Sequence, residues 1–320
     1  MQRFLQSLSN FAYQRNYQSD MGTVGEGGWC EGPDHAALYS LYRPSPPEAL
    51  IARIVTYVGD GVRVNDEVET VALDVGCGPG QSTLPLADHF DRVIGIDVSK
   101  SQIEAANRIA YKRSNVSFKL VDAGQFPVDD ESCDLVLAVQ ACHWFDLNGF
   151  YRETKRALKT NGTVAIAGYT LPKIEFMDRP ELSELLMEPY LKVYSETANS
   201  WRPERKLVDN EYADFHFPFA HSVYVRGAEA LKNYSCDTVT TLDGVRGYLK
   251  SWSGFRTHFR ERGGSAAGEA RLDQMVEEYD WIRCPKMARN CGATRQELVS
   301  ASLVLRVPYF FRMGRKQDQF

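Results

Sequence analysis

The sequence of 320 residues lacks any long apolar run, any paired arrangement of cysteines and any strong excess of charge. No stretch approaches the roughly 18 apolar residues of a transmembrane helix, and no lipid-attachment motif is found, so no membrane partner is expected. The net charge of -5 gives no general attraction to nucleic acid, and no nucleic-acid partner is expected either. Internal repeats and low-complexity tracts are also missing, which excludes a repeat architecture.

The seven cysteines are odd in number and follow no disulfide pattern. Together with the lack of a secretory signal, this usage predicts free thiols in a reducing compartment. Cys284 and Cys291 are not at zinc-finger spacing, and no metal site is predicted. We expect a cytoplasmic protein, with a mitochondrial location as the alternative, because residues 1–19 contain Arg3 and Arg15 but no acid.

An apolar run that ends in three alternate glycines is the most informative stretch of the chain. Val71 to Val75 is typical of a strand buried on both faces of a parallel sheet, and Gly76, Gly78 and Gly80 follow directly. Glycines this close together let the backbone approach a ligand where any Cβ would collide. Ligands bind such sheets at the carboxyl ends of the strands. We therefore predict a small polar ligand at this loop.

Three further apolar runs are predicted to be strands of the same sheet, at residues 92–97, 116–121 and 134–139. The first ends in Asp97, about 20 residues past the glycines, the spacing at which a Rossmann-type site places an acid on a ribose. The next two are followed by Asp122 with Ala123 and by Gln140. Since parallel strand ends line one crevice, these residues are predicted to share it. A last strand is expected at 308–316, with a proline at its first position.

Asp74 before the glycines, Asp97, and Asp122-Ala123 before the turn at Phe126-Pro127 form a set that resembles the class I S-adenosylmethionine-dependent methyltransferases. Three further motifs resemble the small-molecule subgroup, methyltransferase type 11, that includes trans-aconitate methyltransferase. They are Tyr42-Arg43-Pro44, His143-Trp144-Phe145-Asp146 and Tyr248-Leu-Lys-Ser-Trp252-Ser253. The resemblance covers about residues 31–316.

The alternation of strands and helices predicts an α/β fold, and the resemblance implies a Rossmann-like, doubly wound sheet of seven strands. A helical N-terminal lid and a C-terminal cap insert are expected to complete it. We expect a flexible extension at residues 1–30 and one methyltransferase domain at 31–320. Its core is predicted at 70–170 and the cap insert, the usual place for acceptor specificity, at about 171–264.

The resemblance implies S-adenosylmethionine as the cofactor, bound in the crevice at the strand ends. The backbone of the glycine loop would hold the methionine part, Asp97 the ribose hydroxyls, and Asp122 with Ala123 the adenine edge. Asp74 is expected to order the glycine loop by accepting backbone N–H bonds. The rest of the predicted cofactor set along this crevice is Gln81, Val98 and Gln140.

The segment Tyr42-Arg43-Pro44 lies before a predicted helix at 48–58, in a region that folds over the cofactor pocket in the resembling family. In one interpretation, Arg43 pairs with the carboxylate of the cofactor, and Tyr42 covers its sulfonium. In the other, Tyr42 is a core residue and Arg43 a surface charge. The residues alone leave both interpretations open.

Methyl transfer from a sulfonium is an in-line displacement, so we expect a pocket that aligns the reactants and excludes water rather than a nucleophilic triad. His143 is the predicted catalytic residue, because a neutral imidazole would take the proton of a hydroxyl, thiol or ammonium acceptor. A carboxylate acceptor needs no base at pH 7, and His143 would then only shape the pocket. Trp144, Phe145 and Trp252 are predicted to line the acceptor pocket, with core positions as the alternative.

The predicted function is a methyltransferase (EC 2.1.1.-) with a small-molecule acceptor, of which a carboxylate is one candidate. A nicotinamide-dependent oxidoreductase is the poorer fit, since Gln81 stands where the dinucleotide fingerprint needs its last glycine. A catalytically silent cofactor-binding scaffold is the other alternative. The run Gln140-Ala-Cys-His143 differs from the Asn/Asp-Pro-Pro-Tyr signature of nucleobase methyltransferases. A monomer or homodimer is expected.

Overall fold

The computed structural model describes residues 41–59, 69–111, 113–178, 180, 183–278 and 301–317. The predicted extension at 1–30 and the residues behind the mitochondrial alternative lie outside this part. Most of the predicted N-terminal lid does as well. No described helix combines the length and the apolar character needed to cross a membrane.

Five parallel strands form the half of the sheet that carries the glycine loop. They are β1 (Val71–Val75), β2 (Arg92–Asp97), β3 (Val116–Leu120), β4 (Cys133–Val139) and β5 (Leu158–Tyr169). Their order is β3-β2-β1-β4-β5, so β1 is central and the chain reverses its winding beside it. All five residues of β1 are buried, as the apolar run predicts. The doubly wound α/β fold is confirmed, and the carboxyl ends of these strands lie at one edge.

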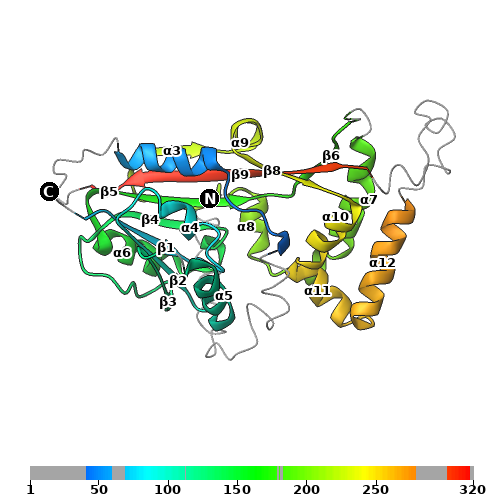
Figure 1. Ribbon diagram of the computed structural model, residues 1–320, viewed down its shortest axis with the longest axis horizontal. Helices are drawn as coiled ribbons and strands as arrows, with labels where there is room; N and C mark the ends of the chain where they lie inside the picture. The colour runs from blue at the N-terminus through cyan, green and yellow to red at the C-terminus, as the bar shows by residue number, and fades with distance from the viewer. Residues whose placement is uncertain are drawn as a thin grey trace, which may run out of the picture.

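The strand β9 (Leu303–Arg315) runs antiparallel to β5 and extends far beyond it. Its later half pairs with β5 and with β7 (Ala220–Val225), and its earlier half pairs with β6 (Lys173–Phe176) and β8 (Ser235–Thr240). The sheet therefore has nine strands within the described residues, where seven were predicted. Figure 1 shows β9 running along the length of the molecule.

The proline of this strand was misplaced by the prediction, because Pro308 lies inside β9 and not at its start. Its carbonyl accepts a hydrogen bond from Thr170 N at 3.4 Å, so its missing N–H falls on the same side of the strand. On that side the pairing changes from Tyr169 at the end of β5 to Lys173 at the start of β6. The absent donor coincides with this break in the ladder, and the strand continues through the proline.

Helices cover the parallel sheet and build a second group around the other half of β9 (Figure 1). Those at the parallel sheet are α3 (Glu48–Gly59), α4 (Thr83–Leu86), α5 (Lys100–Ala110) and α6 (Leu147–Ala157). The second group is α7 (Glu184–Glu196), α10 (Leu242–Lys250), α11 (Ser253–Arg260) and α12 (Gly264–Glu278), with the short α8 (Arg205–Asp209) and α9 (Gly227–Asn233) nearer the sheet. One buried cluster contains side chains of both groups, among them Leu50, Tyr190 and Met275.

Candidate functional site

The glycine loop is held against the end of β2 by two backbone hydrogen bonds and by a carboxylate. Gly76 N and Cys77 N donate to Ile96 O at 2.8 and 2.9 Å. Gly78 N donates to Asp97 Oδ2 at 2.9 Å, and the other oxygen of Asp97 accepts from Ser99 N at 2.8 Å. The predicted pair of glycine loop and strand-end acid therefore forms one unit, and burial raises the pKa of Asp97 while these N–H donors oppose the rise.

Gly78 lies in an open position. Its φ of 53° is in the left-handed region, and a Cβ placed there would meet no atom within 4 Å. Gly76 (φ 70°) is crowded instead, since its Cβ would come within 2.6 Å of Ala141 Cβ. The loop thus leaves bare backbone facing open space beside the Asp97 carboxylate. This arrangement fits S-adenosylmethionine, with the glycine backbone for the methionine part and Asp97 for the ribose hydroxyls.

Asp74 orders the loop, but through hydroxyl groups and not through the backbone N–H bonds that were predicted. It is fully buried, and its Oδ2 accepts from Ser82 Oγ and Thr83 Oγ1, each at 2.7 Å. These two residues begin α4, so the carboxylate ties β1 to the helix that follows the loop. Asp74 Oδ1 has no hydrogen-bond partner in the described part of the chain. Burial raises the pKa of Asp74 to about 6.

The predicted adenine side lies at the ends of β2 and β3. Val98, directly after Asp97, is 46% exposed and offers apolar surface next to the proposed ribose ligand. Asp122 Oδ1 accepts from Gly124 N at 2.7 Å, which closes a tight turn after β3 and leaves Ala123 half-buried. The structure thus brings Asp97, Val98, Asp122 and Ala123 to one edge of the sheet, as predicted from the strand-end rule.

Gln140 joins the ends of β4 and β5. Its φ of 55° is unusual for a residue with a side chain, and its Oε1 accepts from Tyr169 N at 2.9 Å. Gln140 N also donates to Ala167 O at 2.8 Å. Left-handed backbone at a residue other than glycine costs energy and persists where the surroundings hold it in place. Gln140 and Tyr169 therefore connect the carboxyl ends of these two strands by hydrogen bonds.

His143 lies in a short 3-10 helix, η1 (Cys142–Trp144), which begins two residues after Gln140. The cap of α6 fixes where η1 ends, because Asp146 accepts from Asn148 N and Gly149 N at 3.2 Å. His143 is 7% exposed, and its Nδ1 is 2.8 Å from the hydroxyl of Tyr212. Burial, aided by the charge of Arg205, lowers the pKa of His143 to about 3. The imidazole is neutral at physiological pH.

The aromatic residues predicted for the acceptor pocket occupy different places. Trp144 and Phe145 are half-buried beside His143 and the glycine loop, and Phe145 would contact a Cβ at Gly76. Trp252 is 1% exposed, and its ring packs against those of the residues Tyr190, Tyr194, Trp201 and Tyr248. Trp252 thus occupies the core position that was its alternative. Tyr248 of the same motif has the guanidinium of Arg43 over its ring.

Two arginines act on Tyr248. The guanidinium of Arg43 lies 5.6 Å from the centre of the Tyr248 ring and donates to Tyr169 Oη at 3.3 Å. Arg205 is largely buried, stacks over Trp201 at 5.1 Å and pairs with Asp209 at 2.9 Å. The positive charges of both arginines lower the pKa of Tyr248, against the larger effect of its burial. The sequence analysis missed Tyr169 and Arg205, of which the first follows the strand-end rule and the second has no sequence signal.

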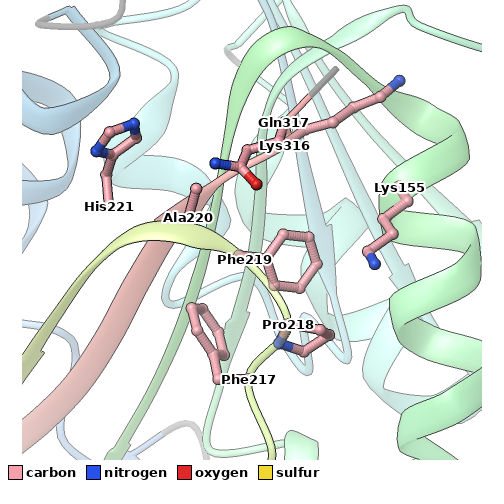
Figure 2. A pocket seen from close by; sticks show the side chains of 8 residues that line it. All are labelled: Lys155, Phe217, Pro218, Phe219, Ala220, His221, Lys316 and Gln317. Atoms are coloured by element: carbon pink, nitrogen blue, oxygen red, sulfur yellow. The ribbon is translucent and has the colours of Figure 1, made fainter. Parts of the chain in front are cut away.

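A surface pocket of about 550 Å³ lies elsewhere, between α6 and the meeting point of β7 and β9 (Figure 2). It is lined by Lys155 of α6, by Phe217 and Phe219, and by Lys316 just after β9. The end of β9 pairs with Thr163, near the amino end of β5. The pocket is therefore at the edge of the sheet opposite the glycine loop and does not belong to the candidate site.

Comparison with known proteins agrees with this geometry. A family model described as a methyltransferase domain matches residues 73–166, the stretch that holds the glycine loop, the acidic strand ends and η1. A putative methyltransferase of Dictyostelium discoideum is 34% identical over 219 residues, which cover 68% of this chain and 74% of that protein. The chain belongs to the class I S-adenosylmethionine-dependent methyltransferases. Its cofactor is S-adenosylmethionine.

Two further similarities support the methyltransferase assignment. A probable S-adenosylmethionine-dependent methyltransferase of Saccharomyces cerevisiae is 31% identical over 153 residues, which cover 46% of this chain and 48% of that protein. The solved structure of a putative type II methyltransferase from Anaeromyxobacter dehalogenans gives a TM-score of 0.62 at 26% identity and covers 87% of this chain and 100% of that one. The oxidoreductase alternative is not favoured, and the narrower resemblance to the trans-aconitate subgroup stays a prediction.

Proposed function

We propose that this methyltransferase transfers the methyl group to a carboxylate oxygen of a small organic acid. Bound S-adenosylmethionine supplies a methyl group already activated by the positive sulfur that carries it. The chain then has to align the acceptor and exclude water, and it needs a base only where the acceptor must lose a proton. The cytoplasmic location and the monomer or homodimer expected from the sequence remain predictions.

The observation that carries this proposal is the state of His143. A general base works best when its pKa is near the working pH, whereas burial lowers the pKa of this imidazole to about 3. Its Nδ1 is also engaged by Tyr212, whose own pKa burial raises well above its usual value. Such a pair is poorly suited to deprotonating an alcohol or an ammonium group. A carboxylic acid is already ionised at pH 7 and requires no such step.

The positive charges near the strand ends support an acidic acceptor. Arg43 and Arg205 both lower the pKa of Tyr248, and Arg205 also acts on His143. Guanidinium groups remain charged at every physiological pH and match the planar geometry of a carboxylate. Arg43, from the segment before α3, and Arg205 of α8 therefore place positive charge near the carboxyl ends of β4 and β5, where an acid would be oriented toward the cofactor site.

The chemical stability of the product tests the proposal. When the protein is given methyl-labelled S-adenosylmethionine and a panel of small acids, alcohols, thiols and amines, we expect labelled product from acids only. Mild alkali should release that label as methanol, because methyl esters hydrolyse under conditions in which ethers, thioethers and methylated amines persist. Label that survives alkali in every product would reject the carboxylate acceptor while leaving the methyltransferase assignment intact.

The substitution His143→Gln provides a second prediction. An amide at this position keeps a polar group opposite Tyr212 but cannot accept a proton, so we expect kcat with an acid acceptor to fall by less than about 10-fold, well under the 10²–10⁴-fold of general-base catalysis. The pH dependence of the rate should also be the same in the wild type and in the variant. Steady-state kinetics between pH 6 and 9 check both points, with Tyr212→Phe as the matched control for loss of the hydrogen bond alone. A loss of 100-fold or more in His143→Gln only would restore the histidine as a base.

A further inference from the structure

The segment Tyr42-Arg43-Pro44, here called the strap, is anchored by its backbone to two other parts of the fold. Gln81 Nε2 donates to Arg43 O at 2.9 Å, and Tyr309 Oη donates to Pro44 O at 2.9 Å. Gln81 follows directly after Gly80, the last glycine of the loop, and Tyr309 lies in β9. The strap is therefore held by Gln81 at the end of the glycine loop and by Tyr309 in the sheet.

The side chains of the strap are directed at α10. Arg43 Nη2 donates to Ser251 O at 3.1 Å, just beyond the end of this helix, and its guanidinium lies over the Tyr248 ring at 5.6 Å. The ring of Tyr42 rests on Gly247, where a Cβ would come within 2.2 Å of Tyr42 Cε1 and Cζ. Only a residue without a side chain leaves room for that ring.

A glycine at position 247 needs a structural reason, because glycine destabilises the interior of a helix. It costs roughly 1 kcal/mol relative to alanine there, and Gly247 is buried in the middle of α10. Its φ is not in the left-handed region, so the backbone itself does not require glycine. The contact with Tyr42 is the feature of the structure that does.

We infer that Tyr42 and Arg43 are positioning residues that couple the glycine loop to α10, so that filling the cofactor site sets the position of this helix, which belongs to the insert predicted to bind the acceptor. The path runs from Gly80 and Gln81 to the strap backbone and from the strap side chains to Gly247, Tyr248 and Ser251. Every step of it is a hydrogen bond or a packing contact between described residues. The inference requires an acceptor near α10 but does not depend on that acceptor being an acid.

The coupling has a thermodynamic consequence. If the state of the cofactor site biases that of the acceptor site, binding of either ligand changes the protein's affinity for the other ligand. The factor is the same in both directions, commonly about 5- to 150-fold. The cofactor product S-adenosylhomocysteine is the probe, since it needs no acceptor. We expect it to slow hydrogen–deuterium exchange of the α10 peptide 242–251 in the wild-type protein. The exchange of α9, which packs on β8 and β9, should stay unchanged, whereas α12 is no control because Arg246 and Lys250 of α10 pair with its Glu269.

A double-mutant cycle separates coupling from ordinary damage. Gly247→Ala places a methyl group where the Tyr42 ring lies, so the strap should be displaced, with S-adenosylhomocysteine affinity falling about 5-fold or more. Tyr42→Ala removes the ring, so the double variant should regain the affinity that Gly247→Ala loses. In all three variants the protection of α10 by S-adenosylhomocysteine should fall below that of the wild type, although the contacts of Arg43 with Tyr248 and Ser251 remain. Tyr42→Phe keeps the ring and should retain both affinity and protection.

Calorimetric titration and exchange mass spectrometry on the full chain decide the outcome. The inference is overturned if Tyr42→Ala transmits as much protection to α10 as the wild type does, or if the double variant binds S-adenosylhomocysteine as weakly as Gly247→Ala alone. Should Gly247→Ala fail to fold, the comparison of Tyr42→Ala with Tyr42→Phe remains decisive. Loss of protection in both of these variants would also overturn the inference, since the phenyl ring keeps the contact with Gly247. None of these results depends on the product-stability test, so failure of one proposal leaves the other standing.

Discussion

Gly78→Ala is expected to abolish most cofactor binding in a protein that still folds. Gly76→Ala is expected to lower both the affinity for the cofactor and the stability of the fold. Both glycines have a left-handed backbone, which costs an alanine about 1–2 kcal/mol. At Gly78 the new methyl group meets no protein atom within 4 Å. It therefore enters the space assigned to S-adenosylmethionine, and we expect affinity to fall at least ~10-fold, which corresponds to about 1.4 kcal/mol.

At Gly76 the same substitution meets Ala141 Cβ at 2.6 Å and Phe145 Cζ at 3.2 Å. Overpacking of this kind costs about 1–3 kcal/mol beyond the backbone strain, so we expect a total loss of roughly 2–5 kcal/mol in the free energy of unfolding. Urea denaturation measures the stability of each variant, and calorimetric titration measures its affinity for S-adenosylmethionine. If Gly78→Ala binds as tightly as the wild type, the open space above this residue is not the cofactor site.

The features that could be predicted from sequence are those set by neighbouring residues and by strand ends. Gly76, Gly78 and Gly80 were predicted to let the backbone approach a ligand, and all three prove to have positive φ, a conformation that glycine adopts without steric cost. Asp97 holds the loop because a parallel sheet places the end of β2 beside the end of β1, a consequence of topology and not of its particular side chains. The same rule located Asp122 and Gln140.

Features that depend on distant segments could not be predicted in this way. Tyr212 and Arg205 reach His143 from more than 60 residues away, and their position is set by how the insert packs on η1. Gly247 could not be singled out from the sequence, because the ring that needs its space comes from residue 42. The partners of Asp74 were assigned to the wrong chemical group for a related reason. Ser82 and Thr83 approach the carboxylate only once α4 turns back over the loop.

Asp74 supports the other large prediction, a pH dependence of stability. Burial raises its pKa to about 6, from an ordinary value of 3.8, so the folded state binds more protons than the unfolded state between these two values. Stability contributed by the protonated form is therefore present below pH 3.8 and is lost as the pH rises through about 6. A shift of about two pKa units corresponds to about 3 kcal/mol, of which about 2 kcal/mol should develop between about pH 4.5 and 7.5.

Asp74→Asn removes this ionisation while an amide oxygen can still accept from Ser82 and Thr83. The variant should therefore gain about 2 kcal/mol on the wild type as the pH rises over that interval, whatever the absolute cost of its buried amide. Thr83→Val tests the cause, because loss of a hydroxyl that stabilises the charged carboxylate should raise the pKa further and make the pH dependence steeper. Urea unfolding at several pH values gives all three curves. Parallel curves for the wild type and Asp74→Asn would show that this carboxylate is not held partly neutral by burial beneath the cofactor loop.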